Sequence, residues 1–251
     1  GVMREITSKL GLLVLLFSVG NVSAETLKFS YWDDAKPPFV IEHDGVVHSG
    51  IIKDLADQIS SEAGLQAEFV KLPVLRIEQQ LQSGDIDVDC LTSPIWKELP
   101  SSYHWSPVLF DGADRFLVRP ELSLKLHSYN DLKGTTLGIY NGYVYHPEVM
   151  SLIKSGDVAT IKLKGLEHGI HLLQLKRLDV LIDFGILLKY QLRERKLNEQ
   201  LVLAKLPADE YKLHCAYSKQ IKNKIAPKTL DMLIENLVRT GELDRILKRY
   251  Q

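Results

Sequence analysis

The sequence predicts an α/β fold, because strand-like runs and amphipathic helical runs follow each other along the chain. Residues 26–32 alternate in the manner of a strand with one buried face. Residues 51–59 carry apolar side chains at helical spacing. The same succession of strand and helix resumes at residues 135–140. We therefore expect parallel β-sheet structure covered by helices in each half of the chain.

Turn residues separate the first predicted strands and helices. A hairpin-type turn is expected at residues 43–45, which read HDG. A helix is expected between Gly50 and Gly64, and the second glycine tolerates the left-handed backbone that ends many helices. A strand over residues 67–72 and a helix over residues 73–83 follow.

Residues 84–120 carry the features of a ligand site. A buried strand over residues 86–91 opens into the polar loop 92–94, and aromatic side chains come next. A second strand-like run, residues 115–119, leads away from this loop. In open α/β sheets ligands bind just outside the carboxyl ends of strands. We therefore place the site at this loop.

The same stretch resembles the core of the bacterial extracellular solute-binding proteins of family 3, the amino-acid-type class of periplasmic binding protein. Residues 84–92 read GDIDVDCLT, and Trp105-Ser106-Pro107 stands where the family has Phe-Ser before a proline. Residues 131–134 read DLKG, the sequence with which the family enters its second lobe. The resemblance extends over the whole chain after residue 24.

The resemblance implies a two-lobe, type II (Venus-flytrap) periplasmic-binding-protein fold with two crossover strands. Lobe 1 is expected at residues 25–115 and 215–251, and lobe 2 at residues 116–214. It also implies a monomer that binds a small-molecule ligand between its lobes. The expected partner is an inner-membrane ABC permease or a sensor receptor, and no enzyme activity is expected.

The remaining elements follow from the same reading of periodicity and turns. Strands are expected over residues 135–140, 159–163, 179–184, 201–206 and 211–216, and helices over residues 147–155, 166–176, 186–195, 228–238 and 241–250.

Residues 1–24 have the pattern of a secretory signal peptide. Arg4 and Lys9 precede an apolar run over residues 10–19, and Val22-Ser23-Ala24 forms a small-residue cleavage site. The alternative is a membrane anchor, but the apolar run is about half of the roughly 20 residues that a span requires. We expect cleavage after Ala24 and a periplasmic location.

Charge excludes one class of partner. The formal net charge of the chain is −1, without the basic excess of nucleic-acid-binding proteins. The sequence has no phosphate-binding loop, dinucleotide fingerprint or hydrolase motif, and no cofactor is expected. Glu167, His168 and His171 could form part of a metal site, but a third ligand at a recognisable spacing is missing, and a solvated helix face is favoured.

Cys90 and Cys215 are the only cysteines. The resemblance places them on neighbouring strands, and export permits a disulfide between them. Two buried thiols are the alternative, and the sequence leaves both open.

The ligand-binding candidates lie at the ends of strands and in the loops that follow them. The family often places a ligand-contacting acid at the position of Asp33, although a turn residue would look the same. The start of the helix at Pro147 could bind an anionic group, or it could be an ordinary turn. The predicted ligand-binding residues are Tyr31, Trp32, Asp33, Arg76, Thr92, Ser93, Trp96, Tyr140, Gly142, Tyr143, Asp183 and Phe184.

Two signature contacts of the family are absent or displaced. The arginine that holds an α-carboxylate corresponds to Leu99, and the acid that holds an α-ammonium corresponds to Phe184. Asp183 is one residue away, and strand alternation would turn it to the opposite face unless a bulge intervenes. We expect a ligand other than a standard amino acid held in the usual way. The tyrosines and tryptophans suggest a flatter or partly apolar ligand, or they pack the lobes together.

Two other functions fit the same resemblance. One is a periplasmic docking module in which ligand binding is weakened. The other is a dehydratase-like enzyme, for which Asp33, Glu98 and Asp183 would be the acid–base candidates.

Overall fold

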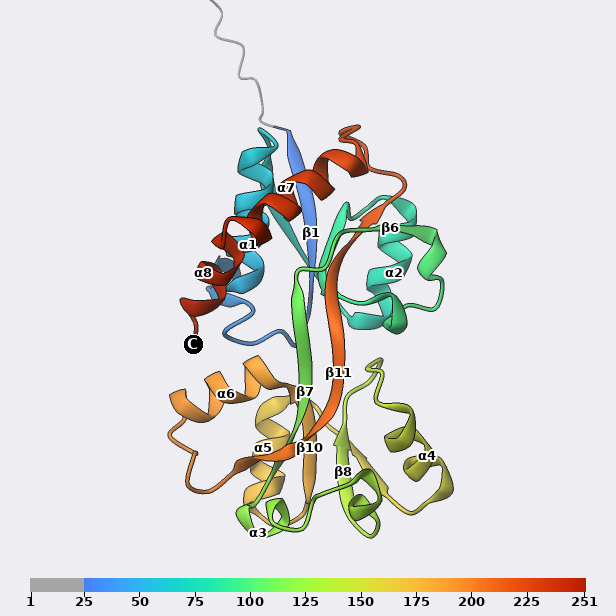
Figure 1. The fold of residues 1–251 in the computed structure, drawn as a ribbon, viewed down its shortest axis with the longest axis vertical. Helices are drawn as coiled ribbons and strands as arrows, with labels where there is room; N and C mark the ends of the chain where they lie inside the picture. The colour runs from blue at the N-terminus through green and yellow to red at the C-terminus, as the bar shows by residue number, and fades with distance from the viewer. Residues whose placement is uncertain (1–24) are drawn as a thin grey trace, which may run out of the picture.

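The computed structural model describes residues 25–251. The predicted signal peptide, residues 1–24, lies outside the described residues. The fold is the expected α/β fold with two lobes, which two long strands connect (Figure 1). No helix among residues 25–251 is long and apolar enough to cross a membrane.

Each lobe has its own part of one continuous sheet. The strand order is β4-β1-β5-β11-β7-β10-β8-β9, with β6 paired to β11, and β2 and β3 form a separate hairpin. The strands are β1 (Thr26–Trp32), β2 (Ile41–His43), β3 (Val46–Ser49), β4 (Gln66–Leu72), β5 (Val88–Thr92), β6 (Tyr103–Trp105), β7 (Phe110–Val118), β8 (Thr136–Ile139), β9 (Ala159–Lys162), β10 (Val180–Phe184) and β11 (Val202–Ser218).

Helices cover the sheet in both lobes. In Figure 1, α1, α2, α7 and α8 belong to the upper lobe with β1, here lobe 1, and α3 to α6 belong to the lower lobe with β8 and β10, here lobe 2. The helices are α1 (Ile51–Glu62), α2 (Val74–Ser83), α3 (Pro120–Ser123), α4 (Pro147–Ser155), α5 (Leu166–Gln174), α6 (Gly185–Glu194), α7 (Pro227–Arg239) and α8 (Glu242–Lys248).

Local sequence accounts for these elements. The apolar positions of α1 are its buried face against lobe 1, as their helical spacing predicts. Gly50 precedes α1 with φ of 115°, and a Cβ there would lie 2.5 Å from the carbonyl oxygen of Phe39. Only glycine fits both the conformation and the contact. The predicted strand over residues 26–32 is confirmed with the same bounds.

The crossover strands differ from the prediction. The sequence predicts separate strands over residues 201–206 and 211–216, but β11 runs without interruption from Val202 to Ser218. Pro207 suggests a break because it lacks an N–H group, yet it lies where the pairing with β7 shifts register and no donor is needed. Likewise β7 begins at Phe110 rather than Arg115, because its polar first half pairs with β11.

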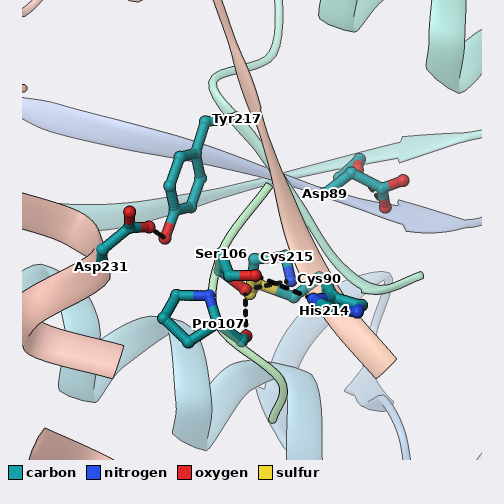
Figure 2. The surroundings of a disulfide bond; sticks show 9 residues. Asp89, Cys90, Ser106, Pro107, His214, Cys215, Tyr217 and Asp231 are labelled. Atoms are coloured by element: carbon teal, nitrogen blue, oxygen red, sulfur yellow. Dashed lines mark hydrogen bonds between the residues drawn. A yellow bond between two sulfur atoms is a disulfide. The ribbon is translucent and has the colours of Figure 1, made fainter. Parts of the chain in front are cut away.

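A disulfide joins the two central strands of lobe 1. Cys90 of β5 and Cys215 of β11 are directly paired, with an S–S distance of 2.01 Å. Figure 2 shows Ser106 beside this bond, where its hydroxyl accepts from the Cys215 N–H at 2.8 Å and donates to the Pro107 carbonyl at 2.7 Å. His214 Nδ1 lies 2.8 Å from the Ser106 carbonyl oxygen. These contacts fix the segment that leads from lobe 1 into β7.

The lobes touch beside α6, and the loop after β8 also reaches α2, where a Cβ on Gly142 would lie 3.1 Å from the Leu75 side chain. The amide of Gln191 in α6 donates to the Pro37 carbonyl of lobe 1 at 2.7 Å. The ring of Phe184 in lobe 2 lies 5.2 Å from Phe39 and 5.9 Å from Trp32, measured between centroids. The aromatic contacts make this side a packed contact between the lobes.

Candidate ligand-binding cleft

A cavity of about 610 Å³ lies between the lobes, within the usual range for small-molecule sites. Its walls come from the end of β1, helix α2, the end of β5 and the segment after it, strand β7, the loop after β8 and the end of β10. Both lobes therefore contact whatever fills it.

Several predicted ligand-binding residues line this cavity. They are Trp32, Thr92, Trp96, Gly142, Tyr143, Asp183 and Phe184. They come from both lobes, and the sequence reached them because each stands at or just after the end of a strand.

The other predicted residues do not line the cavity. Tyr31 is only 4% exposed and packs in the core of lobe 1, while Asp33 and Arg76 face solvent. The Ser93 hydroxyl caps a short 3-10 helix, η1 (Pro94–Trp96), by accepting from the Ile95 N–H at 3.4 Å. Tyr140 lines a second cavity of about 200 Å³ behind the first.

Asp183 and Phe184 both line the cavity, so the expectation that strand alternation separates them is wrong. Alternation holds only while the strand continues, and Phe184 is also the residue that precedes helix α6. Asp183 is 9% exposed, and its Oδ1 accepts from the Phe184 N–H at 2.8 Å. Burial raises the pKa of Asp183 to about 8, and the charge of Asp114 adds to this effect. The Tyr140 hydroxyl lies near the same carboxyl group and opposes the rise in the pKa of Asp183.

Asp114 is a lining residue that the sequence reasoning missed. It stands in the first half of β7, which the sequence does not mark as a strand. The Tyr211 hydroxyl of β11 donates to Oδ1 of Asp114 at 2.6 Å. Burial raises the pKa of Asp114 to about 7, and the Tyr211 hydrogen bond opposes the rise. The sequence offered only one indication of this lining residue: Asp114 is an acid in a segment that has apolar residues on both sides.

Tyrosines surround the carboxyl groups. Burial raises the pKa of Tyr140, Tyr143 and Tyr145, so all three keep neutral hydroxyls. The Tyr145 hydroxyl accepts from the Tyr140 N–H at 2.8 Å and holds the loop after β8 in place. The Tyr140 hydroxyl is buried without a hydrogen-bond partner in the described part of the chain.

The aromatic wall is formed by rings from both lobes. Trp96 meets Tyr211 edge to face with centroids 4.6 Å apart, and it meets Phe184 at 6.0 Å. Trp32 meets Phe184 from the other side. These rings pack the lobes together and also line the cavity, so the two roles proposed for the aromatic side chains coexist here.

One lysine lines the cavity, and it is already paired. Lys97 Nζ lies 2.8 Å from Oδ2 of Asp89, and the side chains of both residues are 9% exposed. The Ser30 hydroxyl donates to the other oxygen of Asp89 at 3.0 Å. The ion pair therefore leaves no net positive charge in the cavity.

The position that corresponds to the carboxylate-binding arginine lies in the cleft. Leu99 lines the cavity and is 54% exposed. The start of α4 does not replace that arginine, because the His146 side chain accepts from the Glu148 N–H at 3.1 Å and the helix start lies off the main cavity. The expectation of an anionic ligand group at this helix is not supported.

Among the described residues, no group of three or more His, Cys, Asp or Glu is placed to hold a metal ion. His168, part of the possible metal pair, instead accepts from the Lys164 N–H at 3.1 Å through Nδ1.

Comparison with known proteins identifies a family and a fold. Residues 31–251 match the bacterial extracellular solute-binding proteins, family 3. No curated protein sequence matches the chain significantly.

Among solved structures, an ancestral arginine-binding protein bound to arginine is similar, with 21% identity, a TM-score of 0.73 and coverage of 90% of this chain and 97% of that one. An amino acid ABC transporter substrate-binding protein of Streptococcus pneumoniae bound to L-arginine has 20% identity, a TM-score of 0.72 and coverage of 90% and 94%. An ancestral amino-acid-binding protein, a precursor of cyclohexadienyl dehydratase, has 16% identity, a TM-score of 0.71 and coverage of 90% and 95%. At these identities the likeness shows the fold alone.

Proposed function

Because the chain belongs to the bacterial extracellular solute-binding proteins of family 3, we propose that it binds a small solute between its lobes in the periplasm and presents the closed form to an ABC importer. The observation that carries this proposal is the cavity of about 610 Å³, whose walls come from both lobes. A solute that contacts both walls favours the closed state, because the open state offers only one of them.

Direct contacts between the lobes support the same proposal. The Gln191 amide reaches the Pro37 carbonyl, and Phe184 packs against Trp32. These contacts close one side of the cavity. The paired strands β7 and β11 form the only chain connections between the lobes within residues 25–251, so they are the natural axis for lobe movement.

The test measures the unfolding midpoint and the radius of gyration of the protein with and without added solutes. The purified protein is unfolded and refolded once to remove carried solute, and then mixed with pools of amino acids, amines, aromatic acids and short peptides. We expect one pool to lower the radius of gyration in X-ray scattering. A solute at a hundred times its dissociation constant adds about 2.7 kcal/mol, or roughly 5–10 °C in the unfolding midpoint. If every pool and a total bacterial small-molecule extract leave both quantities unchanged, the proposal is wrong.

A second candidate function is acid–base catalysis on a bound solute. It is favoured by one observation, the two carboxyl groups Asp114 and Asp183, whose pKa values of about 7 and about 8 suit proton transfer near neutral pH. Proton NMR of the same pools after incubation with the protein distinguishes the two functions. New product signals that the Asp183→Asn variant fails to produce would establish catalysis, and unchanged spectra with a stabilised protein would establish binding.

A further inference from the structure

We infer that the cleft takes an organic ammonium ion that carries no carboxylate, such as a decarboxylated amino acid, an inference that rests on the proposed solute-binding function.

The charged side chains of the cavity are mainly acidic. They are Glu78, Asp89, Lys97, Glu98, Asp114 and Asp183. Lys97 and Asp89 neutralise each other at 2.8 Å. Glu78 is occupied by the Tyr103 hydroxyl at 3.0 Å and by the Glu98 N–H at 3.2 Å. Asp114 and Asp183 are the remaining partly or fully buried acids of the cavity, and neither forms an ion pair with a basic side chain of the described chain.

No arginine of the described chain lines the cavity. Arg76 faces solvent, and Arg115, which Asp183 faces across the β7–β10 pairing, donates from Nη2 to the Ala204 carbonyl at 2.7 Å and does not line the cavity. A ligand carboxylate would therefore find carboxyl groups instead of a fork of donors. A ligand carboxylate could bind only while these acids stay protonated, because like charges in a partly buried site repel each other strongly where solvent screens them poorly.

Asp183 is the residue that would attract the ammonium group of the ligand. It is a buried residue that lines the cavity, and the one hydrogen bond of ordinary geometry to its carboxyl group within residues 25–251 comes from the Phe184 N–H, to Oδ1 at 2.8 Å. A ligand that donates can complete the hydrogen bonding of Oδ2, together with the neighbouring Tyr140 hydroxyl. An ammonium group carries three donors and a positive charge, which matches this oxygen in both respects.

The raised pKa values of Asp114 and Asp183 agree with this geometry. Without a ligand, burial disfavours the ionised forms, and the charge of Asp114 adds to this effect at Asp183. A bound cation favours their ionised forms, so binding releases protons to solvent.

The rest of the cavity fits the body of such a ligand. Trp32, Trp96 and Phe184 line it with aromatic rings, which attract cations and apolar groups alike. Leu75 and Leu99 line its rim and are 65% and 54% exposed. An amine with an aliphatic or aromatic body satisfies both the acids and these walls.

The experiment uses pairs of solutes that differ only in the carboxylate. Isothermal titration calorimetry compares agmatine with arginine, cadaverine with lysine, and tyramine with tyrosine. We expect at least one amine to bind about tenfold or more tighter than its amino acid, since a charge-assisted contact is worth roughly 1.5–3 kcal/mol. Acetylation removes the charge of the ammonium group that is modified, so the acetylated derivative of that amine is expected to bind about tenfold or more weakly than the amine itself.

Substitutions test the two acids. In Asp114→Asn and Asp183→Asn the amine should lose about tenfold or more in affinity, because each variant removes one charge without changing shape. Asp111→Asn is the matched control on the same strand, since Asp111 is 77% exposed and pairs with Lys212 outside the cavity. Its affinity should equal that of the wild type.

The outcomes separate this inference from the proposed function. If an amino acid binds as tightly as its amine, or if only solutes without an ammonium group compact the protein, the inference is wrong and solute binding stands. If none of the solutes and no component of a bacterial extract binds, both are wrong. If an amine binds to Asp183→Asn as tightly as to the wild type, the inference is also wrong.

Discussion

Tyr211 and Asp114 tie the two crossover strands together at the floor of the cleft. The Tyr211 hydroxyl of β11 donates to Oδ1 of Asp114 in β7 at 2.6 Å. The contact joins the hinge to the ligand cavity, because Asp114 lines the cavity while both strands run between the lobes. Under the proposed function, a change in the charge of Asp114 therefore acts on the strands that form the proposed axis of lobe movement.

Tyr211→Phe should weaken amine binding at neutral pH. The hydrogen bond opposes the rise in the pKa of Asp114, so its loss leaves more of this carboxyl protonated. We expect a loss of about two- to tenfold in affinity at pH 7 that disappears by about pH 9. Calorimetric titrations between pH 6 and 9 measure it. Tyr217→Phe is the control, because the Tyr217 hydroxyl donates to Asp231 away from the cavity (Figure 2). A loss that is independent of pH would contradict the prediction.

The stability of the solute-free protein should fall as pH rises from about 4 to 8, through Asp183. The pKa of this group is 3.8 in the unfolded chain and about 8 in the fold, so the folded state holds an extra proton in this window. The slope for one group approaches about 1.4 kcal/mol per pH unit. Urea unfolding at several pH values should show a flatter profile for Asp183→Asn than for wild type.

The groups that face Asp183 are Asp114, Asp34 and the Tyr140 hydroxyl, and the variant leaves all of them in place. The difference between the two profiles therefore reports Asp183. Asp111→Asn should follow the wild type. Parallel profiles for wild type and Asp183→Asn would show that this carboxyl titrates at its ordinary pKa.

Trp32→Ala and Tyr143→Ala should each weaken solute binding strongly, with little loss of fold. Each side chain lines the cavity from a different lobe, so each removes one wall of the site. A desolvated cation–aromatic contact is worth about 2 kcal/mol, a factor of roughly 30 in affinity. Calorimetry measures the binding, and circular dichroism checks the fold. Trp105→Ala is the control outside the cavity, and wild-type affinity in both test variants would mean that the site is elsewhere.

Leu99→Arg should give the protein affinity for carboxylates. Leu99 lines the cavity, and an arginine there can form a two-pronged pair with a carboxylate. We expect arginine or lysine to bind about tenfold or more tighter than to wild type, while the decarboxylated partner weakens. Ile95→Arg adds the same charge at a residue that is 65% exposed and outside the cavity, so it should change neither affinity. An equal gain in both variants would indicate a general effect of charge.

Reduction of the Cys90–Cys215 disulfide should destabilise the protein. The bond joins residues separated by 125 positions, so it restricts the unfolded chain strongly. We expect the free energy of unfolding to fall by about 2–4 kcal/mol. Urea unfolding with and without a phosphine reductant measures this. The double variant Cys90→Ala, Cys215→Ala should not respond to the reductant, and an unchanged midpoint for the reduced wild type would contradict the prediction.

The sequence predicted the elements well because the signals are local. The bounds of β1 and the start of α4 at Pro147 follow from side-chain periodicity and from where proline can stand. The side of the sheet that each residue faces is not a local property. Alternation shows that Tyr31 and Trp32 point in opposite directions, but only the packing of α1 and the lobe contact decide that Trp32 faces the cavity.

The acidic centre of the cleft could not be read from the sequence. Asp114 lies in a polar stretch that becomes a strand only because β11 pairs with it, and its partner Tyr211 is distant in sequence. Asp183 was named, but the turn from β10 into α6 decides its direction. Both depend on contacts between segments remote along the chain, and hydrophobic periodicity carries no information about those contacts.

The completion of lobe 1 by the end of the chain sets an order for biosynthesis. Strand β11 supplies the partner of β5, and the Tyr250 hydroxyl donates to Asp54 at 2.6 Å and accepts from the Gly50 N–H at 2.9 Å at the start of α1. A ribosome delivers these segments after those of lobe 2. The elements of lobe 1 that are translated before lobe 2 must therefore wait for β11 and Tyr250, whereas the helices and parallel strands of lobe 2 are already complete.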